Sequence, residues 1–250
     1  MKKTITIVFA SVILMTSCDV VNNAENHANN IINSDGSETE SANPLTNVEV
    51  ISGLREALNV GIENSVKSTS VVDGFLNNTE IRLPFPPDAE KVKQKALDFG
   101  LDAQVEKFET TLNRAAEEAS KEALQIFINA IKNMTVEDGF AILNGGSGAA
   151  TSFLKNQTNE QLKLAFMPKV KEAISKVKLT EYWNPIITKY NNAMTLTGGE
   201  KLNPDLDQFV TDKAIEGLFH MVKKEEDKIR VDPLARVTDL LTRVFGSLNN

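Results

Sequence analysis

The sequence has little of the chemistry from which many enzyme sites are built. It contains one cysteine among 250 residues, Cys18, so no disulfide and no thiolate metal site can form within the chain. Histidine occurs only at His27 and His220, which excludes a zinc site built from several histidines or cysteines. Aromatic residues make up 6% of the chain, so a core must rest on Leu, Ile, Val, Ala and Phe. That composition favours packed helices over a β-sandwich.

The chain also lacks an excess of basic residues. Its formal charge is −7, and it becomes −9 if residues 1–17 are removed, because that segment holds Lys2 and Lys3 but no acid. An acidic protein is not attracted to the phosphate backbone, so the sequence predicts no nucleic-acid partner. With 41% hydrophobic residues, a chain of this length can bury a sizeable core in one large or two small domains.

The apolar run near the start is too short to cross a membrane as a helix. It extends from Ile5 to Met15, whereas a spanning helix needs roughly 20 apolar residues. Two lysines precede the run and small residues follow it, an order that is typical of a signal peptide. The ending resembles the lipobox of bacterial lipoproteins, with methionine at the position where leucine is commonest: Leu14, Met15, Thr16, Ser17 and Cys18.

Lipidation gives the lone cysteine a role. The lipobox resemblance implies that residues 1–17 are removed and that Cys18, then the first residue, carries a thioether-linked diacylglycerol and an acylated amino terminus. Two such attachments hold a protein on a membrane. The alternative is an uncleaved signal with an incidental cysteine. Sorting depends on the few residues after Cys18, and we expect the outer membrane, with the inner membrane as the alternative.

Residues 18–47 have the composition of a disordered tether. Asn, Ser, Glu and Gly dominate from Asp19 onwards, and the scattered apolar residues cannot bury enough surface to offset chain entropy. Fully extended, the tether reaches at most about 3.3 Å per residue. His27 lies within it, where we expect it to be solvated. Residues 48–250 then form the single folded domain.

The folded domain shows helical periodicity and no alternating run typical of a strand. We therefore predict an all-α fold of roughly eight or nine helices around one long central helix. Residues 102–133 carry the longest apolar stripe and are expected to form that axis. Thr135 with Asp138 resembles a capping box opening a helix to Leu143, and Thr158 with Gln161 resembles another, which Pro168 should kink or interrupt. Helices are also expected at 48–66, 88–99 after an irregular connection at 73–87, 182–194, 206–229 and 233–248.

Several short segments of this domain resemble domain-of-unknown-function family 4197. They occur in the family's order over about residues 50–246, and the resemblance implies a helical envelope protein with no known activity. The segments are Asp73-Gly74-Phe75-Leu76, Leu112-Asn113-Arg114-Ala115-Ala116-Glu117, Gly148-Ala149-Ala150-Thr151, Glu216-Gly217-Leu218-Phe219, Ile229-Arg230-Val231-Asp232-Pro233 with Arg236, and Thr238-Asp239-Leu240-Leu241 followed by Val244-Phe245-Gly246.

Two of these segments hold candidate binding residues that also have structural explanations. Arg114 and Glu117 are three residues apart and can pair, which is usually architectural, whereas Asn113 and Arg114 could contact an anion. Residues 144–151, ending in Thr151, could present N–H groups to an anion at a helix start, but they lack the ending of a phosphate loop. The structural alternative is that glycines stop one helix and Ser147 caps the next.

The C-terminal part of the domain contains a cluster of charged residues. Glu226 and Arg230 have the i, i+4 spacing of a helix pair, and Asp232 before Pro233 fits a helix cap. Arg236 has no such simple explanation. If Arg114, Arg230 and Arg236 converge, they would form a cationic pocket on an otherwise acidic protein.

The sequence offers few side chains that could act as a catalytic nucleophile, acid or base. A serine nucleophile would depend on His220, which is more simply explained as a helix-surface or core residue. A hydrolase using carboxylates such as Glu117, Asp138 and Glu226 stays open, although no spacing singles out an acid and a base. The leading hypothesis is a lipid-anchored, non-enzymatic module without cofactor or metal that binds an anionic ligand or an envelope protein. The alternatives are the carboxylate hydrolase and a structural envelope scaffold.

Overall fold

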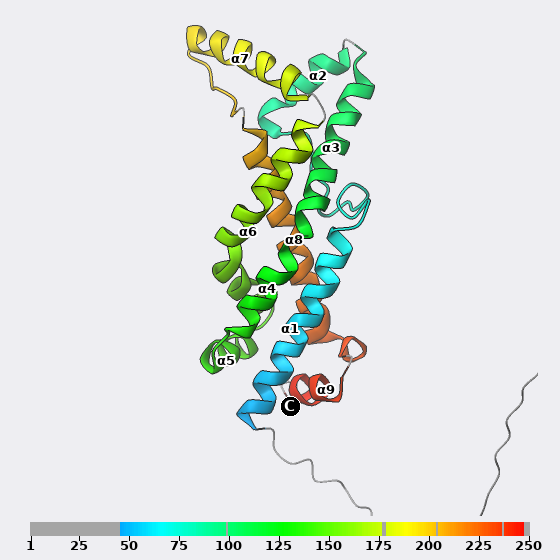
Figure 1. Cartoon of the computed structure of the whole chain (residues 1–250), viewed down its shortest axis with the longest axis vertical. Helices are drawn as coiled ribbons and strands as arrows, with labels where there is room; N and C mark the ends of the chain where they lie inside the picture. The colour runs from blue at the N-terminus through cyan, green and yellow to red at the C-terminus, as the bar shows by residue number, and fades with distance from the viewer. Residues whose placement is uncertain (1–45, 99, 177–178, 204, 237, 248–250) are drawn as a thin grey trace, which may run out of the picture. The chain divides into compact units, whose positions relative to one another are not determined.

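The computed structural model describes residues 46–98, 100–176, 179–203, 205–236 and 238–247, which belong to one compact unit, Asn43–Asn250. The predicted signal segment 1–17, Cys18 and all but the end of the predicted tether 18–47 lie outside the described residues. Within the described ranges the fold is all-α, as predicted (Figure 1). The helices are α1 (Asn47–Thr69), α2 (Glu90–Asp98), α3 (Asp102–Ser120), α4 (Ala123–Lys132), α5 (Val136–Asn144), α6 (Ala149–Ser175), α7 (Leu179–Thr197), α8 (Leu206–Val231) and α9 (Asp239–Ser247), with short 3-10 helices η1 (Pro87–Ala89) and η2 (Pro233–Ala235).

Capping boxes begin two of the helices. At α1 the hydroxyl of Thr46 accepts the backbone N–H of Glu49, whose carboxylate accepts the backbone N–H of Thr46 in return. The predicted box at α5 is confirmed, because Thr135 and Asp138 make the same two bonds at 3.1 and 2.9 Å. Each box satisfies N–H groups that a helix start leaves without an intrahelical partner.

The prediction of one helix over residues 102–133 is wrong. The chain turns at Lys121 and Glu122, whose N–H groups bond carbonyls three residues back, so α3 and α4 are separate helices. The apolar stripe hides this turn, because Ala119 and Ala123 on its two sides are both fully buried. The spacing of apolar residues indicates which side of a helix faces the core. It does not reveal a tight turn after which the next helix keeps the same side toward the core.

The predicted helix start at Thr158 and Gln161 is also wrong. Helix α6 begins at Ala149, and the hydroxyl of Thr158 bonds the carbonyl of Leu154 at 2.7 Å, as an interior residue does. The helix continues through Pro168 instead of being interrupted there. Pro168 is exposed, so water can solvate the carbonyl that its missing N–H leaves unbonded.

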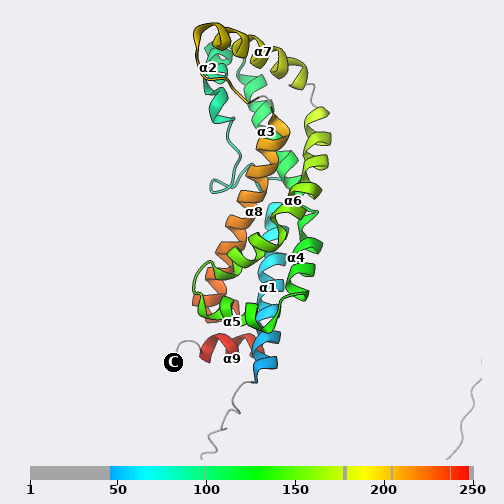
Figure 2. The ribbon, with the colours of Figure 1, turned by 90° about the vertical axis from the view of Figure 1, so that its left-hand side faces the viewer.

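The long central helix is α8, which packs against α1, α3 and α6. Helices α5 and α9 both pack against the first half of α1, and α7 packs on α6 (Figures 1 and 2). The irregular connection between α1 and α2 contributes to the core, because Phe75, Ile81 and Leu83 are buried. No helix among the described residues combines the length and apolar character that crossing a bilayer requires.

Candidate functional site

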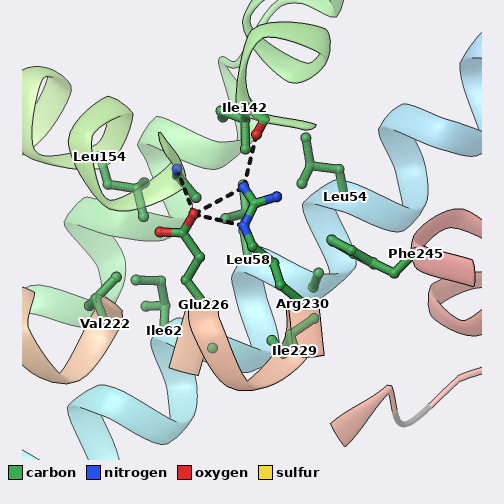
Figure 3. A pocket seen from close by; sticks show the side chains of 13 residues that line it. Leu54, Leu58, Ile62, Ile142, Leu154, Val222, Glu226, Ile229, Arg230 and Phe245 are labelled. Carbon is green, nitrogen blue, oxygen red and sulfur yellow. Dashed lines mark hydrogen bonds and ion pairs between the residues drawn. The ribbon is translucent and has the colours of Figure 1, made fainter. Parts of the chain in front are cut away.

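A small apolar cavity lies between α1, α6 and α8, next to residues of α5 and α9. Its volume is about 30 Å³, which is room for a water molecule and far below the roughly 300–1,000 Å³ of small-molecule sites. The cavity is therefore a packing defect beside a buried ion pair, and not a preformed ligand site. Figure 3 shows its wall, which includes Leu54, Leu58, Ile62, Ile142, Leu154, Val222, Ile229 and Phe245.

Glu226 forms the polar wall of this cavity and caps the start of α6. One carboxylate oxygen accepts the N–H of Ala150 at 3.0 Å, and the other accepts the N–H of Thr151 at 2.9 Å and its hydroxyl at 2.7 Å. The N-cap residue Gly148, at φ +81°, supplies no side chain of its own. The predicted anion position at this helix start is thus occupied by the protein's own carboxylate.

Ser147 does not cap α6, contrary to the structural explanation offered from the sequence. Its hydroxyl donates to Asp227 at 2.6 Å and accepts from the ammonium of Lys223 at 3.0 Å, so it joins the loop to α8. The cap comes instead from a residue 76 positions later in the chain. No spacing in the sequence indicates such a partner.

Arg230 and Arg236 continue this arrangement toward the end of α8. Arg230 pairs with Glu226, as its spacing predicted, at 3.0 Å with both side chains mostly buried, and it donates to the carbonyl of Ile142 at 2.8 Å. The buried Arg236 donates to the carbonyls of Ile229 and Arg230 at 3.2 and 2.9 Å. Arg236 therefore satisfies the carbonyls at the C-terminus of α8.

The residues predicted on the long helix form a second cluster, on α3. Arg114 donates to Glu117 at 2.7 Å and to Asp73 at 2.6 Å, and these carboxylates raise the pKa of Arg114 above its usual value. Glu117 also accepts the backbone N–H groups of Phe75 and Leu76 at 3.1 and 3.2 Å. The cluster holds the α1–α2 connection against α3, which agrees with the architectural interpretation.

Asn113 serves the same connection. Its amide oxygen accepts the N–H of Leu83 at 2.8 Å, and its amide nitrogen donates to the carbonyls of Leu83 at 3.0 Å and Glu109 at 2.8 Å. The side chain is fully buried and has used both of its polar atoms. It is therefore a pairing partner for backbone and has no free atom for a ligand.

The three arginines do not share a partner. Arg230 and Arg236 are adjacent through the carbonyl of Arg230, whereas Arg114 binds the carboxylates of Asp73 and Glu117. Each guanidinium is already engaged by carboxylates or carbonyls. The cationic pocket predicted from the sequence is wrong: the arginines belong to two separate clusters, in which Arg114 and Arg230 are paired with carboxylates and Arg236 is bonded to carbonyls.

The possible hydrolase carboxylates likewise have separate partners. Glu117 lies on α3, Glu226 on α8, and Asp138 in the first turn of α5. The Thr135 hydroxyl and N–H lower the pKa of Asp138, which is opposite to what a general acid requires. Among the described residues, no group of three or more His, Cys, Asp or Glu is arranged to hold a metal ion.

Sequence reasoning missed an open strip along α8, which we call the α8 strip and define by Lys213, Glu216, His220, Lys223 and Lys224. Three hollows adjoin it: one of about 250 Å³ against residues 80–87, one of about 580 Å³ against the start of α6, and one of about 480 Å³ against residues 68–80, which reaches the strip at Lys224. Glu80 faces the strip from the loop. Its carboxylate accepts a hydrogen bond from the ammonium of Lys224 at 2.6 Å and lies 3.3 Å from His220 Nε2. Donation from Lys224, reinforced by His220, lowers the pKa of Glu80.

The comparisons with known proteins give a family and no activity. A family model described as a protein of unknown function (DUF4197) matches residues 44–246, which confirms the resemblance found in the sequence. No curated protein and no solved structure matches the chain. The matched range runs from before α1 into α9, so both charged clusters and the α8 strip lie within it.

Proposed function

The chain belongs to the DUF4197 family, and we propose that it is a lipid-anchored helical module of the cell envelope that binds a protein partner without catalysing a reaction. The anchor is Cys18, for which the signal-like segment and the lipobox resemblance are the support. The module is the helical domain that begins with α1. Its proposed binding surface is the α8 strip.

The observation that supports a non-enzymatic function is that the buried carboxylates accept hydrogen bonds from backbone N–H groups. Glu117 and Glu226 each accept two backbone N–H groups and an arginine, so both oxygens of each carboxylate are occupied. An acid or base in catalysis must instead present a free oxygen to substrate at hydrogen-bond distance. These groups hold helices and loops in place.

The α8 strip favours a protein partner over a small anion. Each lysine of the strip is paired with an acid: Lys213 with Glu216 at 2.6 Å, Lys224 with Glu80 of the loop at 2.6 Å, and Lys223 with Asp227 one turn further along α8. A surface of paired, exposed charges complements another mixed surface and gives little attraction to a lone anion. The hollows are open and adjoining, as an extended segment of a partner requires.

The anchor is tested by replacing Cys18 with alanine in the full chain expressed in a bacterium. We expect the native chain in the membrane fraction with incorporated radioactive fatty acid, and the Cys18→Ala chain without the label. Ser17→Ala, which leaves the cysteine in place, is the matched control and should keep the label. Equal labelling of the native and Cys18→Ala chains would contradict the anchor.

The binding surface is tested by photo-crosslinking in intact cells. A photoreactive residue at position 220 should give a discrete adduct with one protein, because the strip places it between two hollows. The control is the same residue at position 164, an exposed site on α6 outside the strip. Adducts of equal yield and identity at both positions would refute the α8 strip as the binding surface.

A further inference from the structure

Two large apolar side chains are exposed at a hydrogen-bonded turn at the end of α8. Val231, the last residue of α8, is 80% exposed, and Leu234 in η2 is 91% exposed. Within the turn, the carboxylate of Asp232 accepts the N–H of Leu234 at 2.9 Å, and Arg236 bonds carbonyls of α8 just before it. We call residues 231–234 the apolar turn.

The apolar turn lies at the end of the domain where α1 begins. Arg230, beside the turn, bonds the carbonyl of Ile142 in α5, and Arg243 in α9 lies 3.5 Å from Glu49 in the first turn of α1. Figures 1 and 2 both show the start of α1, α5 and α9 together at this end. Two more exposed apolar residues lie in the first turns of helices at this end, Val48 in α1 and Val136 in α5.

We propose that this end of the domain rests on the surface of the lipid bilayer, with Val231 and Leu234 dipping into the interface. The inference rests on the proposed lipid anchor at Cys18. The chain that carries this cysteine enters the domain at α1, 29 residues later, so the apolar turn is on the side where the tether arrives. Tethering keeps the turn at a high effective concentration near the membrane, so a weak contact suffices.

The surrounding charges define the kind of bilayer surface that fits. The charges at this end are mixed. Asp232, Asp239 and Glu137 lie close in sequence to the apolar residues, and so does the exposed Lys228, while Arg243 is paired with Glu49. Mixed charges give no strong preference for anionic headgroups, whereas apolar side chains gain from leaving water on any bilayer. The contact should therefore form on neutral, zwitterionic lipid and should not depend on anionic lipid.

The test uses the lipidated full chain with Leu234→Cys, bound to vesicles of phosphatidylcholine. The thiol of Cys18 is consumed by its thioether, so the introduced cysteine is the single reactive thiol. Its rate with a water-soluble maleimide is compared with that of Leu234→Cys in the Cys18→Ala chain, free in solution. The matched control is Leu196→Cys on α7, which is 89% exposed and lies at the opposite end of the described domain (Figures 1 and 2).

We expect the cysteine at 234 to react about ten-fold more slowly on vesicles, and the one at 196 to react at its free rate. Equal rates at 234 on vesicles and in solution overturn the contact while leaving the anchor intact. Failure of the chain to float with vesicles overturns the anchor, and this contact with it. Stronger protection after addition of anionic lipid would show an electrostatic attachment and overturn the apolar contact.

Discussion

Replacing Glu226 with alanine tests whether this carboxylate holds α6 to α8. The side chain is 8% exposed, caps the N–H groups of Ala150 and Thr151, and pairs with Arg230 at 3.0 Å. Its removal leaves Arg230 without its ionic partner and two amides without acceptors. Deleting one member of a buried pair costs about 3–5 kcal/mol. We therefore expect Glu226→Ala to lower the free energy of unfolding by about 4 kcal/mol and the Tm by about 10 °C.

The measurement is thermal and urea unfolding of the full chain followed by circular dichroism. The matched control is Glu172→Ala, which removes an i, i+4 partner of Lys176 at 2.7 Å on the exposed face of α6 and should change nothing measurable. Removing Arg230 as well should cost less than the sum of the two single changes, because no isolated buried charge is left. The reasoning is refuted if Glu226→Ala and Glu172→Ala are equally stable.

Three further changes test other parts of the fold. Asn113→Ala should cost about 2 kcal/mol by leaving buried backbone unbonded, and hydrogen exchange at the Leu83 amide should then accelerate. Gly217→Ala would place a methyl group 2.7 Å from a buried phenylalanine ring, so urea unfolding should show a loss of about 1–3 kcal/mol, and an unchanged midpoint would contradict this packing. The pKa of Asp138 in the folded state lies below its usual 3.8. The stabilisation that ionised Asp138 gives the folded state is therefore complete above pH 3.8 and is lost as the pH falls through the lowered pKa. Asp138→Asn should accordingly be less stable than the native chain at about pH 7, and the difference should shrink by about pH 3.

Local pairings were predictable from spacing alone. The Thr135–Asp138 box and the Glu226–Arg230 pair need only residues that one helical turn brings together, so the sequence reports them directly. The all-α class followed for the same reason, since helical periodicity is a local property. The apolar stripe predicted the buried side of α3 and α4 correctly and concealed the turn at Lys121.

The partners that join separate parts of the chain were not predictable, because they are distant in sequence. Besides pairing with Arg230, Glu226 accepts the N–H of Ala150, 76 positions earlier. Besides pairing with Glu117, Arg114 donates to Asp73, 41 positions earlier. Neither contact has a fixed spacing. The sequence does not distinguish an arginine that is bonded within the protein from one that is available to a ligand. Three arginines within the family segments therefore suggested a cationic pocket, which the structure does not contain.

The Glu226 cap makes the start of α6 dependent on residues that are synthesised much later. The contact joins positions 76 residues apart, and α1 packs against α9, the first and last helices of the described residues. Closing such long loops is slow and gains stability only when both partners are present. A chain that is synthesised from its N-terminus therefore cannot complete the cap at the start of α6 until α8 follows. We expect the domain to fold in one step after the whole chain is released, and a nascent chain ending before residue 226 to stay open to protease.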